Sequence, residues 1–304
     1  MIYILHDNKK WLVELKKHLE ENKLEYKEWF IDDESNVLEN LDLAGVPPEG
    51  VYYNRVSASS HTRGARFSLE NSRALVEWLE SHNRRVVNGS GTFNLETSKI
   101  SQYLALKRVG VQTPRTYIAT NKNAIIKLCE NKFGNNCIIK DNRSGSGIGV
   151  KRVISREDLV EYLCSTSYVA PIDGITLVQE YIESPEKYIT RVELIGGEYI
   201  YSVRVDTGDG FNLCPADECS LKTKSKFTII KESPHPELVA KYSELAKNNN
   251  LDLCGIEYIV DGEGNTYTYD INCNTNYNSK AEERAGLNNL AVNKITELFK
   301  SVNK

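Results

Sequence analysis

The sequence predicts an α/β protein, with an α+β character in its later part and more than one domain. Over the first ninety residues, short apolar strands alternate with one-sided helices, as in a parallel α/β domain. From about residue 175, strand pairs joined by tight turns predominate, which is typical of antiparallel sheets. The length of 304 residues favours two or three compact units.

Residues 1–93 form the first predicted unit, an N-terminal α/β domain. Strands are expected at "IYIL", "YKEWFI" and "GVYYNRV", and helices over residues 9–21 and 69–82. In both helices, leucine and tryptophan recur at spacings of three and four residues, so they share one face. That face would pack against the sheet.

Residues 94–175 form the second predicted unit. A helix is expected over residues 94–109, with Gly110 just beyond its end. A second helix over residues 122–132 precedes the strands "NCIIK" and "GVKRVI", which flank a glycine-rich turn. Ser155, with Asp158 three residues later, resembles a capping box that opens a further helix.

Residues 176–304 form the third predicted unit. It begins with the strand "TLVQEYI", continues as a hairpin around Gly196-Gly197, and has a helix over residues 236–249. A second hairpin follows in "GIEYIVDGEGNTYTYDINCNTN", and a helix ends the chain.

The second hairpin carries acids on a strand pair. A four-residue loop over 262–265 would pair Asp261 with Thr266 and Glu257 with Asp270. Two carboxylates with Cβ atoms about 5 Å apart destabilise a sheet unless they share a proton, face water or bind a cation. Asn272 on the same face adds a neutral oxygen. A magnesium site and a plain solvated face therefore remain alternatives.

The first hairpin carries two arginines. A turn at Gly196-Gly197 pairs Ile195 with Glu198, and this register puts Arg191 and Arg204 on one face. A ladder of salt bridges explains the pattern, and so does a site that neutralises an anionic substrate or a developing phosphoryl charge.

The segment "IIKDNRSGSGIGV" is a candidate phosphate-binding turn. Lys140 ends its first strand, and the turn that follows contains Ser144, Gly145, Ser146 and Gly147. Successive backbone N–H groups in such a turn can surround a phosphate, although an ordinary turn has the same composition. The segment matches neither the P-loop nor the dinucleotide-binding pattern.

Composition narrows the class of partner. Apolar residues make up 40% and charged residues 26%, with a net charge of −4, so neither nucleic acid nor a membrane is an expected partner. No apolar run approaches the roughly 18 residues of a membrane span, and we expect a cytoplasmic protein. Cys214 and Cys219 have no His near them, which disfavours zinc.

Four segments in order resemble the ATP-grasp superfamily, in particular its glutathione synthetase and RimK-type glutamate ligase branch. The match runs from about residue 85 to the C-terminus through "SKISQYLALKRVGVQTPRT", "IIKDNRSGSGIGV", "LVQEYIESPEKYITRVELIGGEYI" and "GIEYIVDGEGNTYTYDINCNTN". The resemblance implies an ATP-grasp fold, in which two α+β subdomains clamp ATP after an N-terminal α/β domain.

The resemblance also implies a role for each matching residue. The ATP-binding set is Lys99, Lys140, Ser144, Gly145, Ser146, Gly147, Glu180, Tyr181, Ile182 and Glu186, with residues 143–149 as a lid and Glu186 on the ribose. The metal set is Glu257, Asp270 and Asn272, and the anion-stabilising set is Arg191 and Arg204. Arg55, Arg63 and Asn274 are candidates for contact with substrate. Ile189 stands where the branch often has an acid.

The implied activity is an ATP-dependent carboxylate–amine ligase that uses Mg²⁺, or Mn²⁺ in its place, and forms an acyl phosphate. Its substrates would be a small-molecule or peptide carboxylate and an amine. Two alternatives remain open: a ligase that modifies a peptide or protein side chain, and a synapsin-type ATP-binding regulator without ligase activity. A homo-oligomer is also open, because dimers and tetramers are common in the superfamily.

Overall fold

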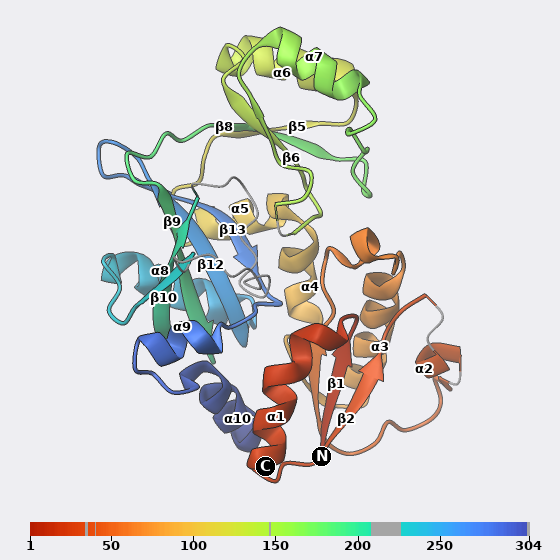
Figure 1. Cartoon of the computed structure of the whole chain (residues 1–304). Coiled ribbons are helices and arrows are strands. Elements are labelled where there is room, and N and C mark those ends of the chain that lie inside the picture. The colour runs from red at the N-terminus through yellow and green to blue at the C-terminus, as the bar shows by residue number, and fades with distance from the viewer. Residues whose placement is uncertain (34–35, 40, 146, 208–225, 303–304) are drawn as a thin grey trace.

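A computed structural model of the chain describes residues 1–33, 36–39, 41–145, 147–207 and 226–302. Three sheets form the frame of the described residues (Figure 1). Their strand orders are β2-β1-β3-β4, β5-β8-β6-β7 and β11-β10-β9-β12-β13. The predicted α/β class, with a parallel first sheet, is confirmed. No helix in the described part of the chain is both long enough and apolar enough to span a membrane.

The N-terminal domain is built on the parallel sheet. Its strands are β1 (Ile2–His6), β2 (Tyr26–Phe30), β3 (Val51–Arg55) and β4 (Arg85–Val87). Its helices are η1 (Lys9–Leu12), α1 (Val13–Glu21), α2 (Asn36–Glu39), η2 (Ser60–Arg63) and α3 (Ser68–Ser81). The leucines predicted to face the sheet, among them Leu15, Leu19, Leu75 and Leu79, are buried.

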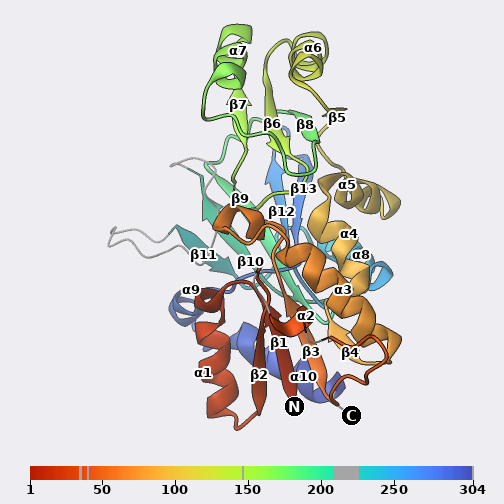
Figure 2. The same cartoon turned by 90° about the vertical axis from the view of Figure 1, so that its right-hand side faces the viewer.

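The central subdomain has an antiparallel sheet with two helices on one face (Figure 2). Its elements are β5 (Thr116–Ala119), α6 (Lys122–Phe133), β6 (Cys137–Asp141), β7 (Lys151–Val153), α7 (Arg156–Cys164) and β8 (Thr176–Glu180). Ser155 caps α7, its Oγ accepting from the Asp158 amide, as the sequence predicted. Because β8 lies between β5 and β6, the sheet extends to Glu180, beyond the predicted boundary at residue 175.

The C-terminal subdomain has the five-stranded antiparallel sheet. Its elements are β9 (Tyr188–Ile195), β10 (Glu198–Asp206), β11 (Phe227–Ile230), α8 (Pro236–Asn248), β12 (Leu253–Val260), β13 (Thr266–Asn272), α9 (Ser279–Arg284) and α10 (Leu290–Val302). One face packs against α8. The other packs against α1, α10 and the N-terminal sheet, which brings the two chain ends to one side of the molecule (Figure 1).

The helix predicted over residues 94–109 is two helices, α4 (Ser90–Thr97) and α5 (Lys99–Arg108). Ser98 separates them with an extended backbone, and its hydroxyl accepts from the Ser101 amide. A capping serine inside an apolar run therefore restarts the helix in a new direction. This restart places Lys99 at the first position of α5.

Both hairpins contain a bulge that the sequence analysis did not predict. In the β12–β13 pair, Tyr269 is the extra residue: Glu257 pairs with Asp270 as predicted, but Val260 pairs with Thr266. Because one extra residue reverses the alternation, Tyr269 joins the acidic face and Thr268 moves to the apolar one. There Thr268 is buried, 2.5 Å from the Tyr242 hydroxyl.

Ile200 is the extra residue in the β9–β10 pair. Glu198 pairs with Ile195 as predicted, but beyond the bulge Arg191 pairs with Val203 and Arg204 pairs with Thr190. The prediction that Arg191 and Arg204 share a face is therefore wrong, since the bulge turns Arg204 to the opposite side of the sheet.

Candidate functional site

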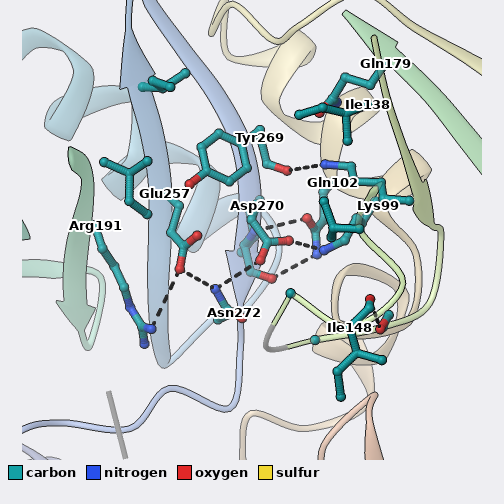
Figure 3. A pocket seen from close by; sticks show the side chains of 18 of the residues that line it. Lys99, Gln102, Ile138, Ile148, Gln179, Arg191, Glu257, Tyr269, Asp270 and Asn272 are labelled. Atoms are coloured by element: carbon teal, nitrogen blue, oxygen red, sulfur yellow. Dashed lines mark hydrogen bonds and ion pairs between the residues drawn. The ribbon is translucent and has the colours of Figure 1, made fainter. Parts of the chain in front are cut away.

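Two rows of paired residues cross three neighbouring strands of the C-terminal sheet, and Figure 3 shows Arg191, Glu257, Asp270 and Asn272 from them. In the first row, Arg191 on β9 pairs with Glu257 on β12, and Glu257 pairs with Asp270 on β13. The second row has Glu193, Gly255 and Asn272 in the same strand order. The pairing register thus gathers residues that are up to 81 positions apart.

The acids of the first row are balanced by cations on both sides. Lys99 forms an ion pair with Asp270 Oδ1, and Arg191 Nη1 lies 3.8 Å from Glu257 Oε1. Asn272 Nδ2 lies 3.4 Å from Glu257 Oε1 and 3.3 Å from Asp270 Oδ2 (Figure 3). The two carboxylates and the amide therefore converge on one point.

Burial and charge set the pKa values of these acids in opposite directions. Burial, and then the charge of Asp270, raise the pKa of Glu257 to about 7. Burial acts the same way on Asp270, but Lys99 and Lys140 outweigh it and hold the pKa of Asp270 below its ordinary value. At neutral pH, Asp270 is thus ionised and Glu257 is divided between its protonated and ionised forms. A cation bound beside them would favour the ionised form of both.

Side chains of α5 support the strand that carries the metal candidates. β13 is an edge strand, and the Gln102 amide completes its ladder: Nε2 donates to Ile271 O at 2.8 Å, and Ile271 N donates to Oε1 at 3.0 Å. The Tyr103 hydroxyl donates to Tyr269 O at 3.1 Å. Asp270 and Asn272, on either side of Ile271, are fixed by these contacts.

Lys140 lies above this strand, at the end of β6. Its Nζ donates to Tyr269 O at 3.3 Å and lies 5.4 Å from the Tyr103 ring and 5.6 Å from the Tyr269 ring. Burial and the nearby Lys99 lower the pKa of Lys140 to about 7. A bound anion would therefore stabilise the charged form of this lysine.

A cavity of about 400 Å³ joins these groups to the other two units. The central subdomain contributes β6, the glycine-rich turn and the end of β8, and the N-terminal domain contributes Trp11 and residues 57–59. The sequence-predicted residues that line it are Lys99, Lys140, Ser144, Gly145, Gly147, Glu180, Tyr181, Ile182, Glu186, Arg191, Glu257, Asp270, Asn272 and Asn274. Ser146 lies outside the described residues, as do Cys214 and Cys219.

Three predicted residues lie elsewhere. Arg204 is exposed on the opposite face of the sheet, 4.6 Å from the Tyr188 ring. Arg63 is bound to Asp7 Oδ2 at 2.7 Å. Arg55 is buried and donates to Thr275 O at 3.0 Å, so it holds protein groups and does not line the cavity.

Sequence reasoning missed several residues of the site. Glu96 accepts from the amides of Ala58 and Cys273, each at 3.0 Å, and so joins the N-terminal domain to the end of β13. Glu96 also lies in the cavity, where burial raises its pKa to about 7. The only signal in the sequence is its position three residues before Lys99.

Comparison with known proteins identifies the family. Residues 97–297, about two thirds of the chain, match the RimK-like ATP-grasp domain.

The chain belongs to the RimK-like ATP-grasp family.

The predicted family and fold are thus confirmed, and solved ATP-grasp structures share the fold. D-alanyl-alanine synthetase A from Vibrio cholerae is 14% identical with a TM-score of 0.70, over 100% of this chain and 98% of that one. The ATP-grasp ligase PsnB, complexed with minimal precursor, Mg and ADP, is 15% identical with a TM-score of 0.65, over 100% and 97%.

A curated relative is the "Probable alpha-L-glutamate ligase 2" of Pseudoalteromonas atlantica. It is 23% identical over 194 residues, which cover 63% of this chain and 60% of that protein. The RimK-like chain therefore spans about three fifths of the length of this relative.

The residues of this RimK-like chain fit a magnesium ion. The two carboxylates are oxygen donors, as Mg²⁺ prefers, and the Asn272 amide, whose Nδ2 faces them, would add its oxygen after a half-turn of the amide group. Arg191 and Lys99 border the set without supplying a competing ligand. Within the described ranges, no group of three or more His, Cys, Asp or Glu side chains is placed to hold a metal ion.

Proposed function

We propose that this protein is an ATP- and Mg²⁺-dependent carboxylate–amine ligase that works through an acyl phosphate. The observation that carries the proposal is one cavity with three buried or nearly buried cations, Lys99, Lys140 and Arg191, beside a carboxylate pair and an amide suited to Mg²⁺. Lysine and arginine grip phosphate oxygens, and nucleotide phosphates need a metal beside them.

The nucleotide would lie between the two antiparallel sheets. Its base would contact the segment from Glu180 to Ile182, which lines the cavity at the end of β8. The Glu180 amide already donates to Arg115 O at 2.8 Å, so the neighbouring groups are held in place. Its phosphates would meet Lys140, Lys99, Ser144, Gly145 and Gly147.

The reaction needs charge neutralisation more than side-chain chemistry. A carboxylate oxygen of the first substrate attacks the γ-phosphorus, the bond to the β–γ bridging oxygen breaks, and ADP leaves. The amine then attacks the acyl carbon, phosphate leaves, and the amine gives up a proton. Lys99, Lys140 and Arg191 offset the charge that moves between these oxygens. Mg²⁺, held by Glu257, Asp270 and Asn272, would supply further charge neutralisation at the phosphates.

No nucleophilic side chain is required. Cys273 follows the metal set directly, but it is buried, and burial raises the pKa of its thiol well above the ordinary range. A protonated buried thiol is a poor nucleophile.

A peptide is the second candidate for the carboxylate substrate. The PsnB structure was solved with a minimal precursor, and the residues that line the cavity of this chain include the uncharged Trp11, Ser57, Ser59, Asn274 and Asn276. Such side chains suit a neutral peptide group as well as an amino acid. These observations support a peptide as the second candidate.

The test is ADP release from MgATP with a panel of amino acids, dipeptides and peptides as paired substrates. We expect substrate-dependent ADP release that is lost in Asp270→Asn. Unchanged turnover in Asp270→Asn would overturn the proposal. Tight MgATP binding without ADP release from any pair would favour the regulatory alternative.

A further inference from the structure

Arg191 is held in place by buried side chains that have no role of their own in the proposed reaction. Its Nε lies 2.7 Å from Glu193 Oε1, and its side chain is 5% exposed, that of Glu193 2%. Its Nη2 donates to Thr275 Oγ1. The planar guanidinium is thus held at two of its three nitrogens, which fixes its orientation as well as its position.

Glu193 and Thr275 are also bound to each other. The Thr275 hydroxyl donates to Glu193 Oε2 at 3.0 Å, so both oxygens of this buried carboxylate are engaged. Glu193 is not part of the candidate metal set and does not line the cavity. A buried carboxylate is costly unless it is paired, and its partner here is the one arginine of the first row.

Gly255 makes room for the arginine. It pairs with Glu193 across β9 and β12, in the second row. A Cβ atom at residue 255 would stand 2.8 Å from Arg191 Nη2 and 2.9 Å from its Cζ, closer than non-bonded carbon and nitrogen atoms approach. The guanidinium therefore lies flat over the backbone of the adjacent strand.

The N-terminal domain holds Thr275 in turn. Arg55 on β3 donates through Nη1 to Thr275 O at 3.0 Å and through Nη2 to Asn276 Oδ1 at 2.7 Å. The segment after β13 is thereby fixed from the far side. A chain of contacts runs from the N-terminal domain to the guanidinium.

We propose that Glu193, Thr275 and Gly255 are positioning residues that aim Arg191 at the transferring phosphoryl group, and that Arg55 holds Thr275 for this purpose. The inference rests on the proposed function. Preorganised donors stabilise a transition state because they need no reorientation as charge develops, and a displacement of about 1 Å can cost on the order of 100-fold in rate.

The proposal predicts a selective defect. Variants of the positioning residues keep the cations and the metal set that bind MgADP, so ground-state affinity stays unchanged. They lose the orientation of Arg191 that stabilises the transition state of phosphoryl transfer. Fluoroaluminate bound beside MgADP mimics that group, and it requires no knowledge of the natural substrates.

The experiment measures, for the full chain, the Kd of MgADP with and without fluoroaluminate by titration calorimetry. Wild type should bind MgADP more tightly with fluoroaluminate than without it. Glu193→Gln and Thr275→Val should keep the Kd of MgADP within about twofold and weaken the fluoroaluminate complex by about 10- to 100-fold. Thr275→Val is the second variant in case Glu193→Gln fails to fold.

Thr190→Val is the matched control. Thr190 is equally buried on β9, but it pairs with Tyr258 on the opposite face, so this variant should behave as wild type in both titrations. In an Arg191→Met background, Glu193→Gln should cost nothing further, because a positioning residue acts only through the residue it positions.

Equal losses in both titrations, no loss in either, or additive losses in the Arg191→Met background would each overturn the inference while MgADP binding still supports the nucleotide site. Failure of wild type to bind MgADP would instead overturn the proposed function, and the inference with it.

Discussion

Replacing Gln102 with leucine tests how far the strand with the metal candidates depends on a helix side chain. The Gln102 amide makes three hydrogen bonds: to Leu95 O at 2.7 Å, to Ile271 O at 2.8 Å and from Ile271 N at 3.0 Å. Leucine has a similar size and makes none of them, so the change removes the bonds without opening a large cavity.

The expected loss of stability in β13 follows from the number of hydrogen bonds removed. A typical hydrogen bond contributes about 1 kcal/mol net, and a buried N–H left without a partner costs about 1–3 kcal/mol. We expect β13 to open more easily by about 3 kcal/mol, which corresponds to about 100-fold faster exchange of the Ile271 amide. Binding of Mg²⁺ with ADP should weaken at the same time, because Asp270 and Asn272 flank Ile271.

Hydrogen–deuterium exchange of the peptide covering β13 measures the first effect, and the rise in thermal midpoint on adding MgADP measures the second. Gln112→Leu is the control. Gln112 is exposed, and its backbone C=O, which accepts from Thr268 N at 2.9 Å, survives the substitution. Exchange within about threefold of wild type in Gln102→Leu would refute the argument that α5 completes this sheet edge.

Three further predictions concern buried charges. His6 is buried in β1, and burial lowers its pKa from 6.5 to about 4, so its protonation favours the unfolded state. The free energy of unfolding should fall by about 3 kcal/mol as the pH drops from 6.5 towards 4. If His6→Gln shows the same dependence of unfolding free energy on pH in a denaturation series, this explanation is wrong. Burial lowers the pKa of Lys140 to about 7, so below pH 10.5 its charge favours unfolding. Lys140→Met should raise the thermal midpoint of unfolding and weaken MgADP binding at least about tenfold. A lower thermal midpoint together with weaker MgADP binding would refute the reasoning. Arg143 is buried, and its Nη1 lies 2.6 Å from Oε1 of Glu70 on α3. Glu70→Ala should speed trypsin cleavage after Arg143 several-fold, whereas Glu77→Ala, at an exposed position of the same helix, should not. Equal cleavage rates in the two variants would show that this ion pair does not hold the segment.

The sequence alone determined the order of the units and most of their elements. Helix periodicity placed α1, α3, α6 and α8 within one to four residues at each end, because one-sided apolar spacing is a local property. The pairing of Glu257 with Asp270 was also local, since it follows from alternation on each strand counted back from a turn. Four motifs in the right order then sufficed for the family.

The tertiary structure decided which side chains share the site. The bulges at Ile200 and Tyr269 reverse the alternation, and they sent Arg204 away from the cavity and brought Tyr269 towards it. Both hairpins pack against a core on each face, and fitting two cores at once selects the bulge, which hairpin counting cannot see.

Gln102, Glu193, Gly255 and Thr275 became meaningful only through their partners. Each has an ordinary interpretation in the sequence: a helix glutamine, a strand acid, a strand glycine and a loop threonine. Their contacts join positions separated by up to 220 residues. The chemistry of a side chain decides whether it can bind a phosphate or a metal. Only long-range packing decides which other residues hold that side chain in the required orientation.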